Sequence, residues 1–160
     1  MLNQKINKYL IFILFFIFIT LISAYFIQYS LGYQPCKLCI YERIPYFLSI
    51  FLLIAILLNP KYRKITLLIL SIVFLCGAFL SFYHFGIEQG FFIESFACES
   101  KSLLKSLSKE QLLEQLKQNN VSCKDISFTI LGLSLATINM VLSFILSLVF
   151  LILFINYREN

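Results

Sequence analysis

The sequence predicts an all-α integral membrane protein, a single four-transmembrane-helix bundle over residues 1–160. Three observations lead to this prediction. The 160 residues are 60% hydrophobic and only 13% charged, too apolar for a soluble domain of this size to cover. Four apolar segments follow one another, each near the ~20 residues that span a bilayer. One long polar segment separates the third from the fourth, so we expect one decorated loop.

The expected spans are residues 9–31, 38–58, 65–83 and 130–155. The first has the position of a signal peptide. Its apolar run is too long for the core of such a peptide, and no A-x-A cleavage site follows it, so we expect a membrane anchor. The Asn59-Pro60 break separates the second span from the third.

Basic residues in the short flanking segments set the expected orientation. They lie before the first span, between the second and third, and after the last: Lys5, Lys8, Lys61, Arg63, Lys64 and Arg158. The positive-inside rule then places both termini in the cytoplasm and loop 84–129 outside, as a long second periplasmic loop. Because the basic residues are scattered between hydrophobic runs, the net charge of +5 indicates topology and no nucleic-acid partner.

The long loop is expected to contain a short amphipathic helix. Residues 108–111 (Ser-Lys-Glu-Gln) fit a capping box, and Leu112, Leu113 and Leu116 then share one face. Such a helix would lie in the headgroup layer or pack on the loop itself, and the sequence leaves both open.

This topology places Cys36, Cys39, Cys98 and Cys123 outside, in the oxidising compartment of a bacterial inner membrane protein. Cys76, in the middle of the third span, is expected to be a small buried hydrophobe. A disulfide between Cys98 and Cys123 would close a loop of about 26 residues and contribute about 3–4 kcal/mol. On its own, such a disulfide could have a purely structural role. The presence of Cys36 and Cys39 in the other outer loop favours disulfide exchange between the two pairs.

Cys36 and Cys39 form a Cys-x-x-Cys pair at the mouth of the second span. The unpaired N–H groups at a helix start favour an anion, so the Cys36 thiol should ionise readily and act as a nucleophile. Four outer thiols beside a membrane helix suggest a thiol oxidase that passes electrons to an acceptor dissolved in lipid.

Arg43 is expected at membrane depth. The uncharged residues 44–58 span about 22 Å, short of the ~30 Å hydrocarbon core, so the helix must take in Glu42 and Arg43 or thin the bilayer. Arg43 is four residues after Cys39 and so shares its helix face, where a guanidinium could hold a quinone carbonyl oxygen. The alternative is an arginine that extends to the interface.

His84, the single histidine, lies at the outer end of the third span. It could shuttle a proton or contact a quinone headgroup, and Glu88 is one turn away as a partner. The alternative is an ordinary interfacial polar residue.

The string Cys36-x-x-Cys39-Ile-Tyr-Glu-Arg43, placed at the start of the second of four membrane helices and followed by an outer Cys98/Cys123 pair, closely resembles the DsbB family of disulfide bond formation proteins. The resemblance covers nearly the whole chain. It implies a quinone-dependent oxidase that recharges a periplasmic thioredoxin-fold dithiol oxidase of the DsbA type, with either ubiquinone or menaquinone as cofactor.

The resemblance also implies roles for the four catalytic cysteines. The reduced partner attacks Cys98 of a Cys98–Cys123 disulfide, and the released Cys123 attacks Cys36 of the second disulfide. Cys39 is left as a thiolate against the quinone ring beside Arg43, and Cys36–Cys39 reforms as two electrons pass to the quinone.

Three other interpretations stay open at this point. One is an enzyme like vitamin K epoxide reductase, which shares the quinone and disulfide logic. Another is a non-enzymatic four-helix protein with structural disulfides, and the third is a zinc site made from the four outer thiolates.

Overall fold

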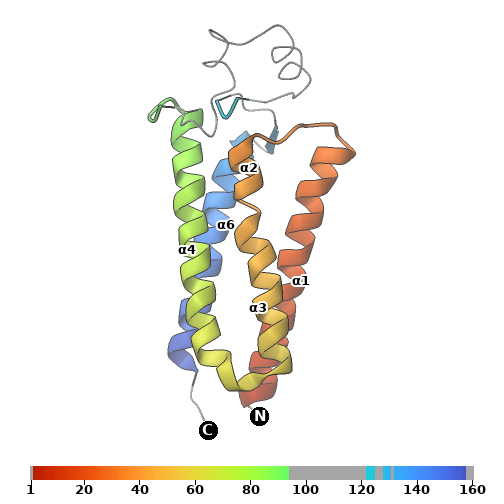
Figure 1. Cartoon of the computed structure of the whole chain (residues 1–160), viewed down its shortest axis with the longest axis vertical. Helices are drawn as coiled ribbons and strands as arrows, with labels where there is room; N and C mark the ends of the chain where they lie inside the picture. The colour runs from red at the N-terminus through yellow and green to blue at the C-terminus, as the bar shows by residue number, and fades with distance from the viewer. Residues whose placement is uncertain (1, 94–121, 125–127, 131, 158–160) are drawn as a thin grey trace, which may run out of the picture.

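The computed structural model describes residues 2–93, 122–124, 128–130 and 132–157 as one bundle of long helices (Figure 1). The elements in chain order are α1 (Leu2–Tyr29), α2 (Lys37–Tyr41), α3 (Ile44–Leu58), the 3-10 turn η1 (Pro60–Tyr62), α4 (Arg63–Glu88), β1 (Thr129–Ile130), β2 (Leu133–Ser134) and α6 (Leu135–Asn156). The loop prediction of a capping box and amphipathic helix lies outside the described residues.

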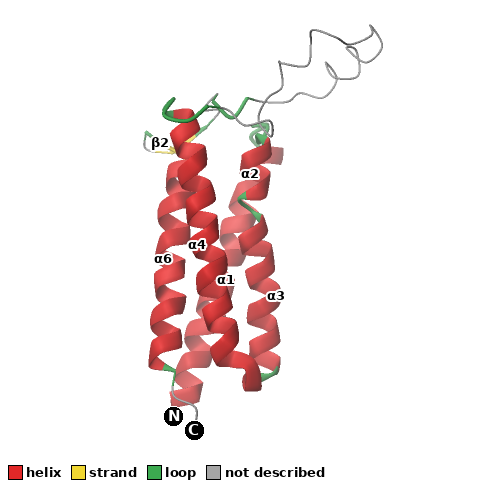
Figure 2. Ribbon diagram, turned by 60° about the vertical axis from the view of Figure 1, so that its left-hand side comes forward, coloured by secondary structure: helices red, strands yellow, loops and turns green. Residues whose placement is uncertain are grey.

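Within the described residues, four helical stretches are long and apolar enough to cross a membrane. They are Ile6–Tyr29, Lys37–Leu58, Pro60–Glu88 and Leu135–Asn156. The prediction of an all-α, four-helix membrane protein is confirmed. The start of α1 and the end of α6 lie at one end of the bundle, and α2 lies at the other (Figures 1 and 2).

The core runs along the bundle axis and is mostly aliphatic and aromatic. Its fully buried members come from all four long helices and include Leu10, Ile17, Leu53, Phe74 and Phe150. Large apolar side chains such as Phe12, Phe51 and Phe79 cover the outside. A soluble protein rarely exposes so many, so this outer surface suits contact with lipid.

Small polar residues join α4 to α6 inside the core. Ser71 Oγ donates to the Ser147 backbone oxygen at 3.0 Å, and Ser147 Oγ donates to the Ser71 backbone oxygen at 2.9 Å. Such side chains let two helix backbones approach closely in a membrane. The packing holds α4 beside α6, including the C-terminal end of α4, where the polar site lies.

Cys76 corrects one expectation. It was expected to be buried, but it is exposed on α4, while Phe74, Gly77 and Ala78 face the core. The 3.6-residue period places Cys76 on the opposite, lipid-facing side of the helix. Its thiol therefore lies apart from the other cysteines.

The second span is two helices and not the single helix that the sequence predicted. Pro45 has no N–H to donate to the carbonyl of Tyr41, so the helical hydrogen-bond pattern is interrupted there. The chain turns at Glu42 and Arg43 between α2 and α3. At this break, Glu42 contacts α4 and α6, whereas Arg43 contacts α1.

Candidate functional site

Cys36 and Cys39 form a dithiol at the end of the bundle opposite the two termini (Figure 1). Both are free thiols, and they share a hydrogen bond with 3.0 Å between the two sulfur atoms. Cys36 is the N-cap of α2, so its sulfur also accepts from the Cys39 backbone N–H at 3.2 Å. The three-residue spacing therefore brings the sulfurs within bonding reach without rearranging the helix.

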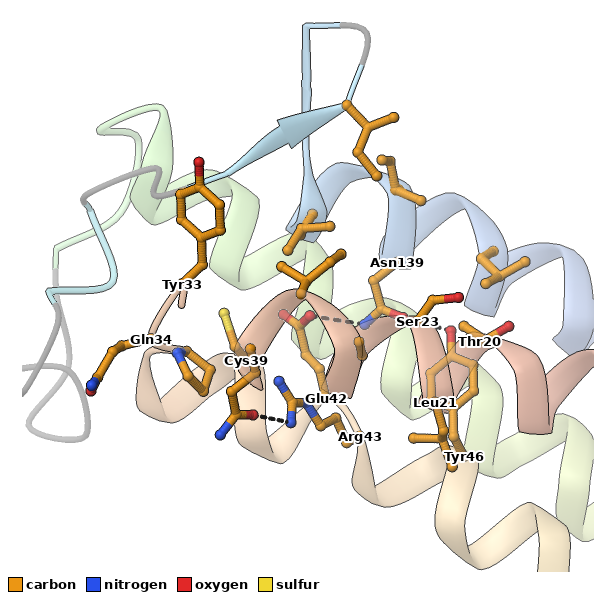
Figure 3. Close-up of a pocket in the computed structure, with 18 residues that line it drawn as sticks. Thr20, Leu21, Ser23, Tyr33, Gln34, Cys39, Glu42, Arg43, Tyr46 and Asn139 are labelled. Atoms are coloured by element: carbon orange, nitrogen blue, oxygen red, sulfur yellow. Dashed lines mark hydrogen bonds between the residues drawn. The ribbon is translucent and has the colours of Figure 1, made fainter. Parts of the chain in front are cut away.

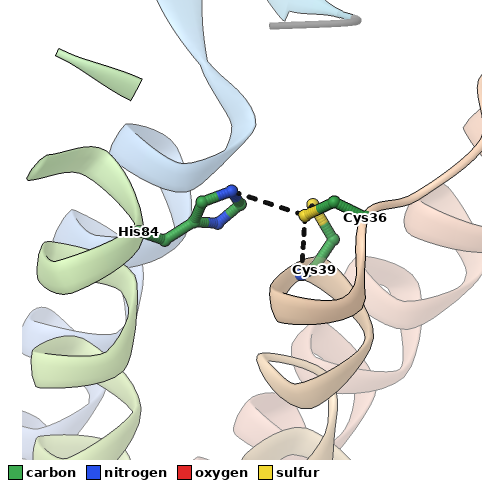
Figure 4. A group of neighbouring side chains, drawn as sticks. All are labelled: Cys36, Cys39 and His84. Atoms are coloured by element: carbon green, nitrogen blue, oxygen red, sulfur yellow. Dashed lines mark hydrogen bonds between the residues drawn. The ribbon is translucent and has the colours of Figure 1, made fainter. Parts of the chain in front are cut away.

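Cys36 is buried, with 5% of its surface exposed, and meets His84 of α4 (Figure 4). Its sulfur is 3.5 Å from His84 Nε2. The hydrogen bond with the Cys39 thiol and the neighbouring imidazole lower the pKa of the Cys36 thiol to about 4, although burial opposes the shift. The expectation of an easily ionised thiol at the helix mouth therefore has a geometric basis.

A carboxylate fixes the orientation of His84. Glu42 Oε1 is 2.8 Å from His84 Nδ1, and both side chains are buried. Because a carboxylate can only accept, Nδ1 carries the hydrogen and Nε2 points at Cys36. Glu88, the partner that the sequence suggested, is farther away, with Oε1 3.9 Å from Nε2.

A cavity of about 220 Å³ lies on the other side of the dithiol, between α1, the α2–α3 break and α6 (Figure 3). Its lining is mainly apolar. The polar side chains at its wall include Gln28, Cys39, Glu42, Arg43, Tyr46 and Asn139. Of the described residues, neither Cys36 nor His84 lines it. The two thiols therefore face different surroundings.

Arg43 is held at the cavity wall by α1. Its Nη1 donates to Gln28 Oε1 at 2.6 Å, and its guanidinium lies 4.8 Å from the centre of the Tyr25 ring. Cation–π contact and a fixed hydrogen bond orient a guanidinium that would otherwise extend to the interface. Arg43 and Cys39 thus line one cavity.

Cys123 lies close to the dithiol. It is buried in one cluster with Cys36, Leu38 and Ile87, and it is disulfide-bonded. Cys98 lies outside the described residues. A zinc site of four cysteines needs four thiolates, so a disulfide at Cys123 is incompatible with it. Cys36, Cys39 and His84 form a smaller group whose ligand atoms all lie within 4.8 Å of one another.

The sequence reasoning missed three polar residues of the site. Glu42 was noted only for its depth, and Gln28 and Asn139 were not considered. The available signal was their occurrence inside apolar runs, since polar side chains at membrane depth are costly and usually functional.

Comparison with known proteins identifies the family of the chain. The model of the family "Disulfide bond formation protein DsbB" matches residues 7–153. The chain belongs to the DsbB family. Its dithiol and four membrane helices are thus those of a membrane protein of disulfide bond formation. No solved structure matches it.

Similar relatives cover most of the chain. An uncharacterised protein of Rickettsia prowazekii is 33% identical over 144 residues, which are 89% of this chain and 83% of the relative. Proteins named disulfide bond formation protein B from Psychrobacter cryohalolentis and Psychrobacter arcticus are each 29% identical over 140 residues, 82% of this chain and 78% of theirs.

Proposed function

We propose that this protein is a thiol:quinone oxidoreductase of the bacterial inner membrane, with its active cysteines on the periplasmic side. It reoxidises a DsbA-like thioredoxin-fold oxidase and passes the electrons to a membrane quinone. The observation that carries the proposal is the position of Cys39, which belongs to the dithiol and lines the same apolar cavity as Arg43.

The cavity suits a quinone headgroup. A quinone offers an apolar ring and carbonyl oxygens that only accept hydrogen bonds. The cavity offers a mainly apolar wall and a guanidinium with five donors, of which Gln28 occupies one among the described residues. A quinone bound there would accept two electrons and two protons from the dithiol.

Electrons would reach the dithiol through the outer pair. The reduced partner attacks Cys98 of a Cys98–Cys123 disulfide, and the released Cys123 thiolate attacks Cys36 of a Cys36–Cys39 disulfide. The shared burial of Cys123 and Cys36 supports this second step, because exchange requires sulfur atoms to approach one another.

The residues around the dithiol then have separate roles in stabilising charge and accepting protons. Exchange at Cys36 leaves Cys39 as the thiolate at the cavity wall, and Arg43 stabilises negative charge there. The Cys98 thiol then attacks Cys123 of the resulting Cys36–Cys123 disulfide, which re-forms Cys98–Cys123 and releases Cys36. The proton of the Cys36 thiol passes to His84 Nε2, while Glu42 holds the ring in place. His84 contacts the thiol and not the cavity, which favours its role as a proton shuttle over headgroup binding.

Reconstitution tests the proposal. The purified protein in detergent is mixed with a reduced thioredoxin-fold dithiol oxidase and with ubiquinone or menaquinone, and quinone absorbance is followed. We expect loss of oxidised quinone in step with partner oxidation, and background rates in a folded Cys39→Ser variant. If the folded wild-type protein, with its cysteines accessible, reduces neither quinone, the proposed function is wrong.

A further inference from the structure

Glu42 is a buried carboxylate bonded on both of its oxygens. Only 6% of the residue is exposed. Oε1 accepts from His84 Nδ1 at 2.8 Å, and Oε2 accepts from Asn139 Nδ2 at 2.8 Å. A charge at this depth is expensive even when paired, so its presence calls for a function.

This carboxyl group reaches both sides of the dithiol. Through His84 it is connected to Cys36, and its own side chain lines the cavity (Figure 3). The break between α2 and α3 makes this possible, because Glu42 lies in the turn and points between α4 and α6.

The proton balance of the proposed reaction requires such a connection. Oxidation of the dithiol forms one S–S bond and releases two electrons and two protons, one from the Cys39 thiol and one that the ionised Cys36 thiol has given to His84 Nε2. Reduction of a quinone in the cavity to the quinol would consume both electrons and both protons. The Cys39 thiol already lines the cavity, whereas Cys36 does not, so the Cys36 proton has to travel.

We propose that Glu42 carries this proton from His84 to the cavity and that Asn139 is the positioning residue that holds its carboxyl group. The proton leaves Cys36 Sγ for His84 Nε2, and the Nδ1 proton passes to Glu42 Oε1. The carboxylic acid then delivers its proton to the quinone oxygen. The inference rests on the proposed function and deepens it.

Asn139 is fixed by two further hydrogen bonds besides the one to Glu42. Its Nδ2 donates to Ser81 Oγ at 2.8 Å, and its Oδ1 accepts from the Tyr46 hydroxyl at 2.5 Å. The Tyr46 hydroxyl is in turn 3.3 Å from Ser143 Oγ. The amide therefore cannot rotate without breaking several hydrogen bonds, and it holds Oε2 from the α6 side.

Removal of the Asn139 amide should affect Glu42 most. In Asn139→Leu, Tyr46 keeps Ser143 as a partner, and Ser81 keeps its bond to the Gly77 backbone oxygen. Among the described residues, only Glu42 Oε2 loses its one partner. Leucine has nearly the shape of asparagine, so the substitution leaves little cavity.

The first test uses Glu42→Gln, which keeps the shape and removes the acid. In rapid-mixing experiments with reduced protein and quinone, we expect the rate constant for quinone reduction to fall about 100-fold. The quinone concentration dependence should change little. The kinetic isotope effect in deuterium oxide should rise, because proton delivery becomes limiting. If Glu42 had only a structural role, the substitution would not combine a slower rate with an unchanged quinone concentration dependence and a larger isotope effect.

Glu88→Gln is the matched control. It removes a carboxylate near the same imidazole, 3.9 Å from Nε2, but Glu88 does not line the cavity. We expect less than about a threefold loss of rate and an unchanged isotope effect, since only a general acid on the path contributes the larger factor.

Asn139→Leu should lower the rate about tenfold, the size of one hydrogen bond to a charged group, and raise the isotope effect. Asn139→Gln, which keeps an amide, should recover part of both. A readout without quinone accompanies these rates. In Glu42→Gln, alkylation of Cys36 should require higher pH, because the neutral amide no longer stabilises a protonated His84.

Two results would separate the inference from the proposed function. If Glu42→Gln reduces quinone at the wild-type rate, or loses activity only through weaker quinone binding with an unchanged isotope effect, Glu42 carries no proton and the inference is wrong. The proposed function would stand, because the wild-type protein still reduces quinone. If the wild-type protein reduces no quinone, both fall.

Discussion

The two thiols of one Cys-x-x-Cys pair lie in contrasting environments. Cys36 is buried beside His84 and shares a cluster with Cys123. Cys39 is half-buried and lines an apolar cavity with Arg43. Two thiols only three residues apart thus differ in their surroundings. Cys36 contacts ionisable side chains, and Cys39 lines a cavity that suits a hydrophobic ligand.

Under the proposed function, this difference shows how a short helix can join two reactions. Exchange with another disulfide needs a sulfur that a second cysteine can approach, and Cys36 has that position. Electron transfer to a lipid-soluble acceptor needs a sulfur at an apolar cavity, and Cys39 lies at such a cavity. Substitutions on the two sides should therefore change different measurements.

Arg43→Ala should give the largest effect on the cavity side. Loss of a hydrogen bond from a charged group costs about 1.5–3 kcal/mol, so the apparent quinone KM should rise about 10- to 100-fold, with a smaller change in kcat. The measurement is the initial rate against quinone concentration. Lys61→Ala, an exposed basic residue at the far end of the bundle, is the control. An unchanged KM would remove Arg43 from the quinone site.

His84→Asn should change the Cys36 side. The pKa of Cys36 is lowered to about 4 from an ordinary 9.0, so the thiol is ionised above about pH 4 and protonated below it. Without the imidazole the pKa of Cys36 should rise. As the pH is lowered, the rate of alkylation by iodoacetamide should then begin to fall at a higher pH than in the wild-type protein. Each unit of rise lowers the thiolate fraction about tenfold below the midpoint.

The alkylation is read by tandem mass spectrometry, which separates Cys36 from Cys39, in a Cys76→Ala background. The quinone KM should stay near its wild-type value, because His84 does not line the cavity. A pH profile identical to that of the wild-type protein would show that His84 does not tune Cys36.

Gln28→Ala should give the smallest effect. It removes the acceptor that orients Arg43 at 2.6 Å but leaves the guanidinium and its contact with Tyr25. The quinone KM should rise a few-fold, as for one ordinary hydrogen bond. Gln89→Ala, an exposed glutamine at the end of α4, is the control. A KM effect as large as that of Arg43→Ala would mean that Gln28 contacts the quinone itself.

The sequence predicted the bundle because a bilayer imposes span length and apolar composition on each helix. It also contained the signal for the break, since Pro45 cannot donate its backbone N–H. Periodicity alone missed the consequence, which is that Glu42 and Arg43 leave the regular helical register. The spacing of Cys39 and Arg43 predicted that they share a helix face, and the structure places both at one cavity, across a turn.

The contacts between helices could not be read from spacing. Cys36 and His84 are 48 positions apart, and Glu42 and Asn139 are 97 apart. Their meeting depends on how α4 and α6 are rotated about their axes, which side-chain packing determines. Asn139 was still detectable in principle, as a lone amide in the apolar run of the fourth span.

The most direct test asks which thiol a quinone covers. Two single-thiol variants are made in a Cys76→Ala background, Cys36→Ser with Cys39 retained and Cys39→Ser with Cys36 retained, so that neither can be oxidised to the inner disulfide. The rate of alkylation of the remaining thiol is measured with and without a fully substituted ubiquinone analogue. We predict that the quinone slows alkylation of Cys39 and leaves Cys36 unchanged. Protection of Cys36 alone, or of neither thiol at saturating quinone, would contradict the division between the two sides.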